Sequence, residues 1–383
     1  TDQIAAFPLL LDELLDERLF ESVPSRAEFE QDLRARMAGA ETDDPEHQID
    51  LLRQFQRVAA FRVAVPDLTG RLPLMKVSDR LTDIAELICA EALSLSWQQI
   101  AERHGLPEYG PDEQHLSQAG LIVVAYGKFG GIELGYGSDL DLVFLHDSAG
   151  EVQRTTGPKV VDNGVFFLRL VQRLVHVLTV HTSAGRLYEV DTRLRPSGKG
   201  GLLVQSLEGF GDYQRGEAWT WEHQALLRAR VVAGDPALRE RFEALRRDLL
   251  RFAVRRATLR EDVRNMRERM RAELSKSGPG QFDLKQDAGG ITDIEFLAQY
   301  WTLHWAERYP ELVTYSDNIR QLESLASADL VPQATVDVLT NAYRAYRQRM
   351  HHLSLEAASN VVSDDEFRET RAAVTAIWNA MMT

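Results

Sequence analysis

The 383-residue sequence contains only one cysteine and no long uninterrupted run of apolar residues. A single thiol excludes disulfide bonds within the chain and zinc sites of the cysteine–histidine type, and it is typical of proteins from a reducing compartment. Because Cys89 lies in an apolar helical pattern, we expect a small core residue there. The chain starts at Thr1 and not at Met, as a fragment or a processed chain would. With no signal peptide and no stretch of about eighteen apolar residues, the sequence predicts a cytoplasmic protein with no membrane partner.

Positive charge is also scarce, because the chain has 44 lysines and arginines but 58 aspartates and glutamates, for a formal net charge of −14. General nucleic-acid binding depends on basic patches, so we expect no nucleic-acid partner. Three common motifs are missing as well. The loop at 127–137 lacks G-x-G-x-x-G, and the chain has neither G-x-x-x-x-G-K-[ST] nor G-x-S-x-G. These absences argue against a dinucleotide enzyme, a P-loop NTPase and a serine hydrolase.

What the sequence does contain is a glycine-rich stretch at 123–147 that leads into paired acids. Residues 122–125 are β-branched or apolar and predict a strand, which a series of glycines interrupts from Gly127 onward. Asp139 and Asp141 then open a second apolar run. In a strand, side chains two residues apart point the same way, roughly 6.6–7 Å apart along the strand, so both carboxylates should share one face. Such a pair can share divalent cations, and paired metals roughly 3.5–4 Å apart serve nucleotidyl transfer. The alternative is an ordinary solvated strand face.

The glycine turn and the acid pair together resemble the nucleotidyltransferases related to DNA polymerase β. In that superfamily the turn approaches a triphosphate closely while the next strand holds the metals, which implies nucleotide contacts by Gly127, Lys128 and Ser138. Lys128 departs from the pattern, since many members carry Ser or Gly there, and a surface lysine is the alternative.

The superfamily also implies a third acid on a neighbouring strand, and Asp191 is the candidate. It ends a strand expected over 186–191, and a buried helix expected over 165–180 separates it from the acid pair. The alternative is that Asp191 caps the strand or pairs with Arg193 or Arg195. Lys199 adds a third cation after Asp191, and all three suit a triphosphate and leaving pyrophosphate. Ion pairs with nearby acids such as Glu189 remain the other reading for the arginines.

Three longer stretches narrow the resemblance: GKFGGIELGYGSDLDLVFLHD, YEVDTRLRPSGKGG and GGITDIEFLAQY. They look like signature stretches of the glutamine synthetase adenylyltransferase family, whose members carry two related nucleotidyltransferase domains. One domain attaches AMP to a tyrosine of glutamine synthetase, and the other removes it by phosphorolysis. The version GYGSDLDL resembles the C-terminal, adenylylating half. The resemblance implies ATP as substrate, two Mg²⁺ ions held by Asp139, Asp141 and Asp191, glutamine synthetase as acceptor, and control by glutamine and the PII signalling protein.

Apolar residues at helical spacing predict helices on both sides of this segment. The expected helices cover 9–20, 28–37, 49–61, 81–104, 207–214, 218–230, 236–255, 259–274, 292–305, 318–325, 332–355 and 364–382. Asp79 and Thr82 offer N-cap chemistry for the fourth, 105–118 reads as a linker, and 202–204 resumes a strand. The sequence thus predicts an α+β fold with three domains. These are a helical N-terminal region at 1–118, a nucleotidyltransferase domain with a small sheet at 119–234, and a helical regulatory domain at 235–383.

Several further side chains have two possible interpretations. The eight arginines between Arg251 and Arg271 are expected on a solvated helix face, with a phosphate or partner surface as the alternative. Asp293 and Glu295 should lie in the first turn of a helix, where residues two apart do not share a face and make a poor metal pair. Trp219 and Trp221 are expected in the core, with stacking on adenine as the alternative. His223 is expected to have a structural role.

These observations predict AMP transfer from ATP to a tyrosine of glutamine synthetase. Two alternatives stay open. One is phosphorolytic deadenylylation at a similar site. The other is a non-catalytic module that binds glutamine synthetase or PII through its helices, although intact acids at all three positions argue against it.

Overall fold

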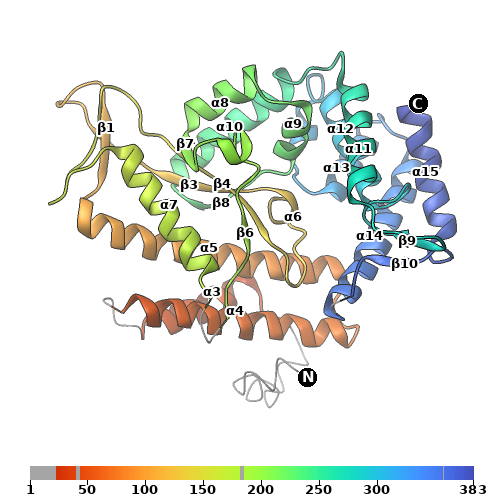
Figure 1. The fold of residues 1–383 in the computed structure, drawn as a ribbon, viewed down its shortest axis with the longest axis horizontal. Helices are drawn as coiled ribbons and strands as arrows, with labels where there is room; N and C mark the ends of the chain where they lie inside the picture. Colours follow the sequence, from red (N-terminus) through yellow and green to blue (C-terminus); the bar gives the residue numbers. More distant parts are fainter. Residues whose placement is uncertain (1–22, 40–43, 182–184, 357) are drawn as a thin grey trace. The chain divides into compact units, whose positions relative to one another are not determined.

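The computed structural model describes residues 23–39, 44–181, 185–356 and 358–383, and it shows a mixed α+β fold with small sheets (Figure 1). The chain divides into two compact units. One comprises the described residues up to Leu207 together with Val231–Arg239, and the other comprises Glu208–Arg230 and Glu240–Thr383. Within these ranges no helix is long and apolar enough to cross a membrane. The helix predicted at 9–20 lies outside the described residues, and the three-domain division stays a prediction.

The first unit opens with three helices, α3 (Arg26–Met37), α4 (Pro45–Leu68) and α5 (Leu74–His104). The Ser25 hydroxyl caps α3, and Glu28 completes a capping box. The N-cap predicted at Asp79 or Thr82 is wrong, because α5 begins directly after Pro73, and the predicted start missed the turn that buries Val77. Helix α4 likewise continues past its predicted end at 61, because apolar residues of its last turns are still buried.

The central sheet of this unit contains β3 (Leu121–Ala125), β4 (Leu140–His146), β6 (Val190–Asp191), β7 (Val204–Ser206) and β8 (Arg230–Gly234). Its order is β6-β4-β3-β8, and β7 also pairs with β4. Strands β3 and β4 are antiparallel, whereas β6 and β7 both run parallel to β4. The single turn α6 (Gly127–Gly130) connects β3 to the glycine-rich loop, and α7 (Asn163–Thr179) lies in the crossover from β4 to β6. The order strand, turn, strand, helix, strand is therefore as predicted.

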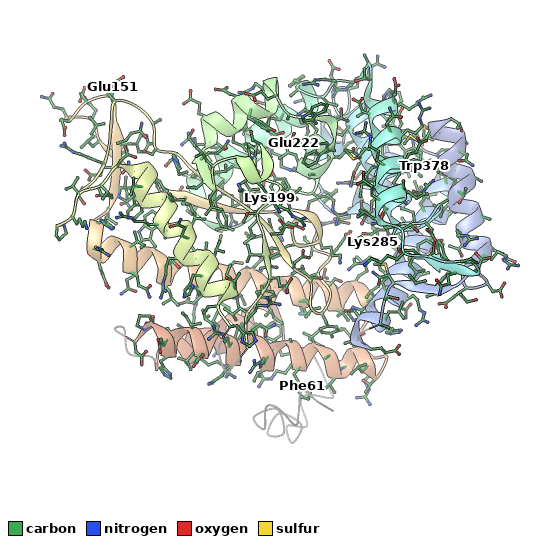
Figure 2. All side chains as sticks on the ribbon, in the orientation of Figure 1. Phe61, Glu151, Lys199, Glu222, Lys285 and Trp378 are labelled. Carbon is green, nitrogen blue, oxygen red and sulfur yellow. The ribbon has the colours of Figure 1, made fainter. Side chains whose placement is uncertain are left out.

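One hydrophobic core joins the three N-terminal helices to this sheet. Apolar side chains of α3, α4 and α5 share it with α7 and with strands β3 and β4. Every residue of β3 is buried, so both faces of that strand are covered. Figure 2 shows the side chains that fill the space between these helices and strands. The N-terminal helices thus share one hydrophobic core with the acid-bearing sheet.

A second, three-stranded sheet corrects the predicted linker at 105–118. Strands β1 (Pro107–Gly110), β2 (Ser117–Gln118) and β5 (Val152–Thr155) form it in the order β2-β1-β5, with antiparallel pairing. The sequence pattern missed β1 because it is short, begins with proline, and pairs with residues more than forty positions later. The strand predicted at 186–191 is shortened to β6, and the one at 202–204 is shifted to β7.

The second unit is mostly helical. Its helices are α8 (Leu207–Gly216, of which Leu207 belongs to the first unit), α9 (Thr220–Leu227), α10 (Pro236–Phe252, of which 240–252 belong here), α11 (Leu259–Leu274), α12 (Ile291–Trp305), α13 (Asn318–Ser327), α14 (Gln333–Leu355) and α15 (Arg368–Met382). Single turns η2 (Gly198–Gly200), in the first unit, and η3 (Pro310–Val313), in the second, complete the list.

Two expectations for this part of the chain were wrong. Only helices were predicted from residue 236 onward, but β9 (Gln281–Asp283) pairs with β10 (Val361–Ser363). Helix α15 also starts four residues later than predicted, because a turn occupies 364–367. The helix predicted at 218–230 ends at Leu227, because the chain enters β8 at Arg230. Both errors concern strands whose partners lie far away in sequence.

Candidate functional site

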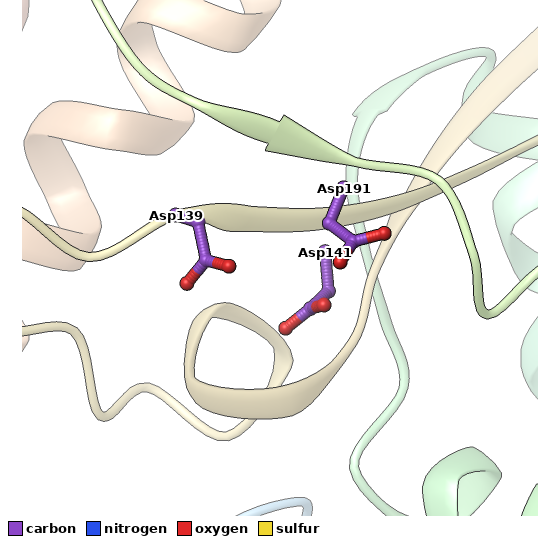
Figure 3. Close-up of side chains that lie close together, drawn as sticks. All are labelled: Asp139, Asp141 and Asp191. Carbon is purple, nitrogen blue, oxygen red and sulfur yellow. The ribbon is translucent and has the colours of Figure 1, made fainter.

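Three carboxylates meet where β4 and β6 run side by side. Asp139, Asp141 and Asp191 each offer an oxygen, and these oxygens all lie within 4.8 Å of one another (Figure 3). We refer to these residues as the acid cluster. Asp141 and Asp191 are direct neighbours in the parallel register, whereas Leu140 and Leu142, on either side of Asp141, are fully buried. Among the described residues it is the only group of three or more potential metal ligands of this kind.

A tight turn delivers Asp139 to the cluster. The backbone N–H of Ser138 donates to the carbonyl of Gly135 at 3.2 Å, and the N–H of Gly135 donates to the Ser138 hydroxyl at 3.1 Å. Gly137 has a φ of +66°, which suits the third position of a type II turn. The hydroxyl of Ser138, a predicted nucleotide contact, therefore also closes the turn that leads into β4.

Gly127 lies against the cluster at the start of α6. Its φ is +56°, and a Cβ at this position would lie 2.4 Å from Oδ2 of Asp141. Only glycine leaves room here for both the backbone turn and the carboxylate. The N–H of Tyr126 donates to the carbonyl of Asp141 at 2.9 Å, which ties the turn to the strand. The next residue, Lys128, is exposed.

The cluster raises the pKa of its most enclosed member. Burial, followed by the negative charges of Asp139 and Asp191, raises the pKa of Asp141 to about 6, and the charges of Lys128 and Arg193 offset part of this effect. Carboxylates that are arranged to share a divalent cation repel one another in this way when the cation is absent. Mg²⁺ binds oxygen ligands almost exclusively, so three carboxylates at this spacing fit the ion that the sequence implies.

Arg193 pairs with Asp191, which is one of the alternatives that the sequence left open. Its Nε donates to Oδ2 of Asp191 at 2.6 Å, and its backbone N–H donates to Oδ1 at 2.8 Å. The hydrogen bond from the Arg193 side chain is the main reason that the pKa of Asp191 is lowered. Glu189, the other acid considered, pairs with Arg186 instead.

Arg195 and Lys199 occupy different positions in the loop that follows. The Arg195 guanidinium donates to the carbonyls of Thr192 at 2.7 Å, Lys199 at 3.1 Å and Gly201 at 3.2 Å, so it holds the loop together. Lys199, labelled in Figure 2, is exposed. Its charge contributes to lowering the pKa of Asp191. The loop therefore presents an exposed cation on a backbone that the Arg195 hydrogen bonds hold together.

Two tyrosines that sequence reasoning did not single out also flank the cluster. Tyr136 precedes Asp139 by three residues, and Tyr188 precedes Asp191 by three. The Tyr136 hydroxyl donates to Oδ2 of Asp67 at 3.3 Å, and the Tyr188 hydroxyl is hydrogen-bonded to Gln56. The repeated spacing of an aromatic hydroxyl ahead of an acid was the available sequence signal.

The charged stretch around Asp293 has a structural explanation within the second unit. Asp293 lies in the first turn of α12, as predicted, but its carboxylate is buried and accepts from Nε of Arg267 at 2.6 Å. Arg267 is 0% exposed, so the solvated face predicted for the arginines of α11 is wrong at this position. Arg271 also pairs with Asp293, at 3.2 Å.

The remaining candidates differ in burial. His223 is buried and its ring is hydrogen-bonded to the carbonyl of Gln214 at 3.0 Å, which confirms a structural histidine. Trp219 is 66% exposed, so a core position is wrong for it. Cys89 is buried in α5, as predicted, and burial raises the pKa of its thiol.

Comparison with known proteins identifies the family. Residues 1–245 match the family model described as glutamate-ammonia ligase adenylyltransferase, and residues 258–369 match the one described as GlnD PII-uridylyltransferase. The chain is 51% identical over 375 residues to a bifunctional glutamine synthetase adenylyltransferase/adenylyl-removing enzyme from Thioalkalivibrio sulfidiphilus. It is 48% identical over 380 residues to the protein of the same name from Nitrosococcus oceani.

These alignments cover 98% and 99% of the chain but 39% of each relative, so the chain spans about two fifths of the length of the curated relatives that it matches. The match to the glutamate-ammonia ligase adenylyltransferase family model covers well over half of the chain, and it includes the whole acid cluster. On these grounds, the chain belongs to the glutamate-ammonia ligase adenylyltransferase family.

Proposed function

We propose that this chain is the adenylylating half of such an enzyme, and that it transfers AMP from ATP to a tyrosine hydroxyl of glutamine synthetase in the cytoplasm. The observation that carries the proposal is the convergence of three carboxylates beside the glycine turn at Gly127. The names of the relatives supply the acceptor protein. The strand order around the cluster supports a small sheet of the polymerase-β type.

In the proposed reaction the tyrosine oxygen attacks the α-phosphorus of ATP. The bond from that phosphorus to the bridging oxygen of the β-phosphate breaks, pyrophosphate leaves, and one of the three carboxylates accepts the hydroxyl proton. Asp139, Asp141 and Asp191 would hold two Mg²⁺ ions, which neutralise the triphosphate and lower the pKa of the attacking hydroxyl.

The neighbouring residues have supporting roles in this proposal. Gly127 leaves room for the triphosphate to approach the backbone, next to a turn that Ser138 closes. Lys128 and Lys199 are exposed near the acids and would contact the phosphates. Arg193 would bind leaving pyrophosphate, while Arg195 holds the loop that carries Lys199.

Regulation is part of the proposal. The match of residues 258–369 to a PII-uridylyltransferase model supports a regulatory role for the helical segment at 235–383. We propose the PII signalling protein and glutamine as its effectors, as the family resemblance implies. Phosphorolytic deadenylylation remains the second candidate, because the relatives carry both activities in their names.

The test uses ATP labelled at the α-phosphate, Mg²⁺ and purified glutamine synthetase, with the native chain compared with Asp139→Asn. We expect metal-dependent labelling of glutamine synthetase that Asp139→Asn abolishes and that the exposed control Glu151→Gln retains. Absence of labelling by the native chain, with and without glutamine and PII, would rule out adenylylation. Phosphate-dependent removal of AMP from modified glutamine synthetase, with ADP as the product, would then identify the deadenylylating activity.

A further inference from the structure

The backbone ladder alone holds two of the three acids weakly. Asp139 lies just before β4 begins, and Asp191 ends a strand that pairs with β4 over only two residues. A metal site requires its ligands to stay within a fraction of an ångström, and a misplacement of about 1 Å can cost about 100-fold in rate. Contacts outside the sheet must therefore hold these two positions.

Both tyrosines that precede the acids reach the same helix. The Tyr136 hydroxyl donates to Asp67, and the Tyr188 hydroxyl is hydrogen-bonded to Gln56; both partners lie on α4 (Pro45–Leu68). Gln56 and Asp67 are eleven residues apart, which is about three full turns, so they share one face of the helix about 16 Å apart. One helix thus contacts the segments that lead into Asp139 and Asp191.

Asp67 also lies at a position in α4 that is unfavourable for a carboxylate. Carboxylates near a helix C-terminus oppose the macrodipole, and the last turn of α4 contains no basic residue to compensate. In the fold this carboxylate accepts a hydrogen bond from Tyr136, at the tip of the turn that leads into Asp139.

A third contact ties α4 to the chain ahead of Asp191. Arg53 is buried, and its Nη2 donates to the carbonyl of Val180 at 2.7 Å, just after the end of α7. The backbone N–H of Tyr188 in turn donates to the carbonyl of Leu178 at 3.0 Å. The segment that ends in Asp191 is therefore fixed to α4 both where it leaves α7 and at Tyr188.

We infer that Tyr136 and Tyr188 are positioning residues, and that Asp67 and Gln56 hold them so that α4 sets the separation of the acids across the metal site. The inference rests on the proposed function, because it assigns the acids to metal binding. It gives the N-terminal helices a direct influence on the affinity of the cluster for divalent cations.

The test measures Mn²⁺ binding to the chain by electron paramagnetic resonance, without nucleotide or acceptor. Loss of one hydrogen bond typically costs enough to weaken binding about 3- to 10-fold, which is the effect we expect for Tyr136→Phe and for Asp67→Ala. Asp67→Asn retains an acceptor oxygen and should restore most of the affinity. The double variant Tyr136→Phe/Asp67→Ala should bind no more weakly than either single variant, because both remove the same contact.

A matched control separates positioning from general loosening of the fold. Tyr343 is a buried tyrosine with a side-chain partner, since Asn318 donates to its hydroxyl at 2.9 Å in the second unit. Tyr343→Phe should leave Mn²⁺ affinity unchanged even if it lowers the unfolding midpoint. If Tyr136→Phe is poorly folded, Asp67→Ala carries the test, because its carboxylate is not part of the core.

Two outcomes would overturn the inference in different ways. Native Mn²⁺ affinity in both Tyr136→Phe and Asp67→Ala would refute positioning by α4 and leave the proposed function intact. Native affinity in Asp141→Asn would show that the metal binds elsewhere, and both proposals would fail together. Weakened binding in the two positioning variants, with rescue by Asp67→Asn, supports the inference.

Discussion

Asp141→Asn should stabilise the metal-free chain while it removes the activity. The cluster raises the pKa of this carboxyl from its ordinary value of 3.8 to about 6, chiefly through burial and the neighbouring acids. A carboxyl whose pKa is raised by folding favours the folded state only while it is protonated. Its contribution is therefore fully present below pH 3.8 and is lost as the pH rises through about 6.

The size of the effect follows from the same values. Because one pKa unit corresponds to about 1.4 kcal/mol, ionised Asp141 costs the folded chain up to about 3 kcal/mol at pH 8. Solvent around the half-buried side chain reduces this figure, so we expect Asp141→Asn to gain about 1–3 kcal/mol at pH 8 and about half as much at pH 5. Asparagine has nearly the same shape and carries no charge.

The assay is urea unfolding in a chelating buffer at pH 5 and pH 8, followed by the same measurements with excess Mg²⁺. The metal should stabilise the native chain by mass action and reverse the order of the two proteins. Glu151→Gln, at an exposed carboxylate, is the control and should show no gain. If Asp141→Asn is no more stable than the native chain at pH 8 without metal, repulsion within the acid cluster does not destabilise the metal-free fold.

Three further predictions concern other positions. Gly127→Ala should lower AMP transfer by at least about 100-fold, because its Cβ would lie 2.4 Å from a carboxylate oxygen of the acid cluster. Gly137→Ala, also at positive φ but with no atom within 4 Å, should lose less activity in the same labelling assay, and equal losses would contradict the steric argument. Arg267→Met should destabilise the second unit by about 3–5 kcal/mol in urea unfolding, because it leaves Asp293 buried without its main partner; a cost below about 1 kcal/mol would refute this. Burial lowers the pKa of His146 to about 4, so its ring signals in NMR should not titrate between pH 5 and 8, and its contribution to stability should be lost as the pH falls from 6.5 towards 4.

The features of this chain that depend on neighbouring residues could be predicted from its sequence. Helix α11 spans the predicted residues 259–274, and α7 differs from its prediction only at the ends. Both are long segments with a sustained helical period, in which neighbouring residues determine the outcome. The common face of Asp139 and Asp141 was readable for the same reason, since it depends only on the two-residue period of a strand.

Features that depend on partners far away in the sequence could not be predicted from it. Strands β8, β9 and β10 are three to five residues long, and each exists because a remote strand offers hydrogen bonds. The burial of Arg267 was missed likewise, since its partner Asp293 lies 26 residues away and a helical wheel shows only an arginine-rich face. Whether Arg193 pairs with Asp191 or with another acid depends on the path of a loop, which side-chain chemistry alone does not determine.

The threading of the chain between the two units limits how the protein can be dissected. Residues 208–230 belong to the second unit, yet the chain then returns to supply β8 to the sheet of the first. A fragment that ends after β8 keeps the sheet complete but carries α9 without α11 and α12, against which it packs. A fragment that ends at Leu207 lacks an edge strand. On the ribosome, likewise, the sheet with the acid cluster cannot be completed until part of the second unit has been synthesised.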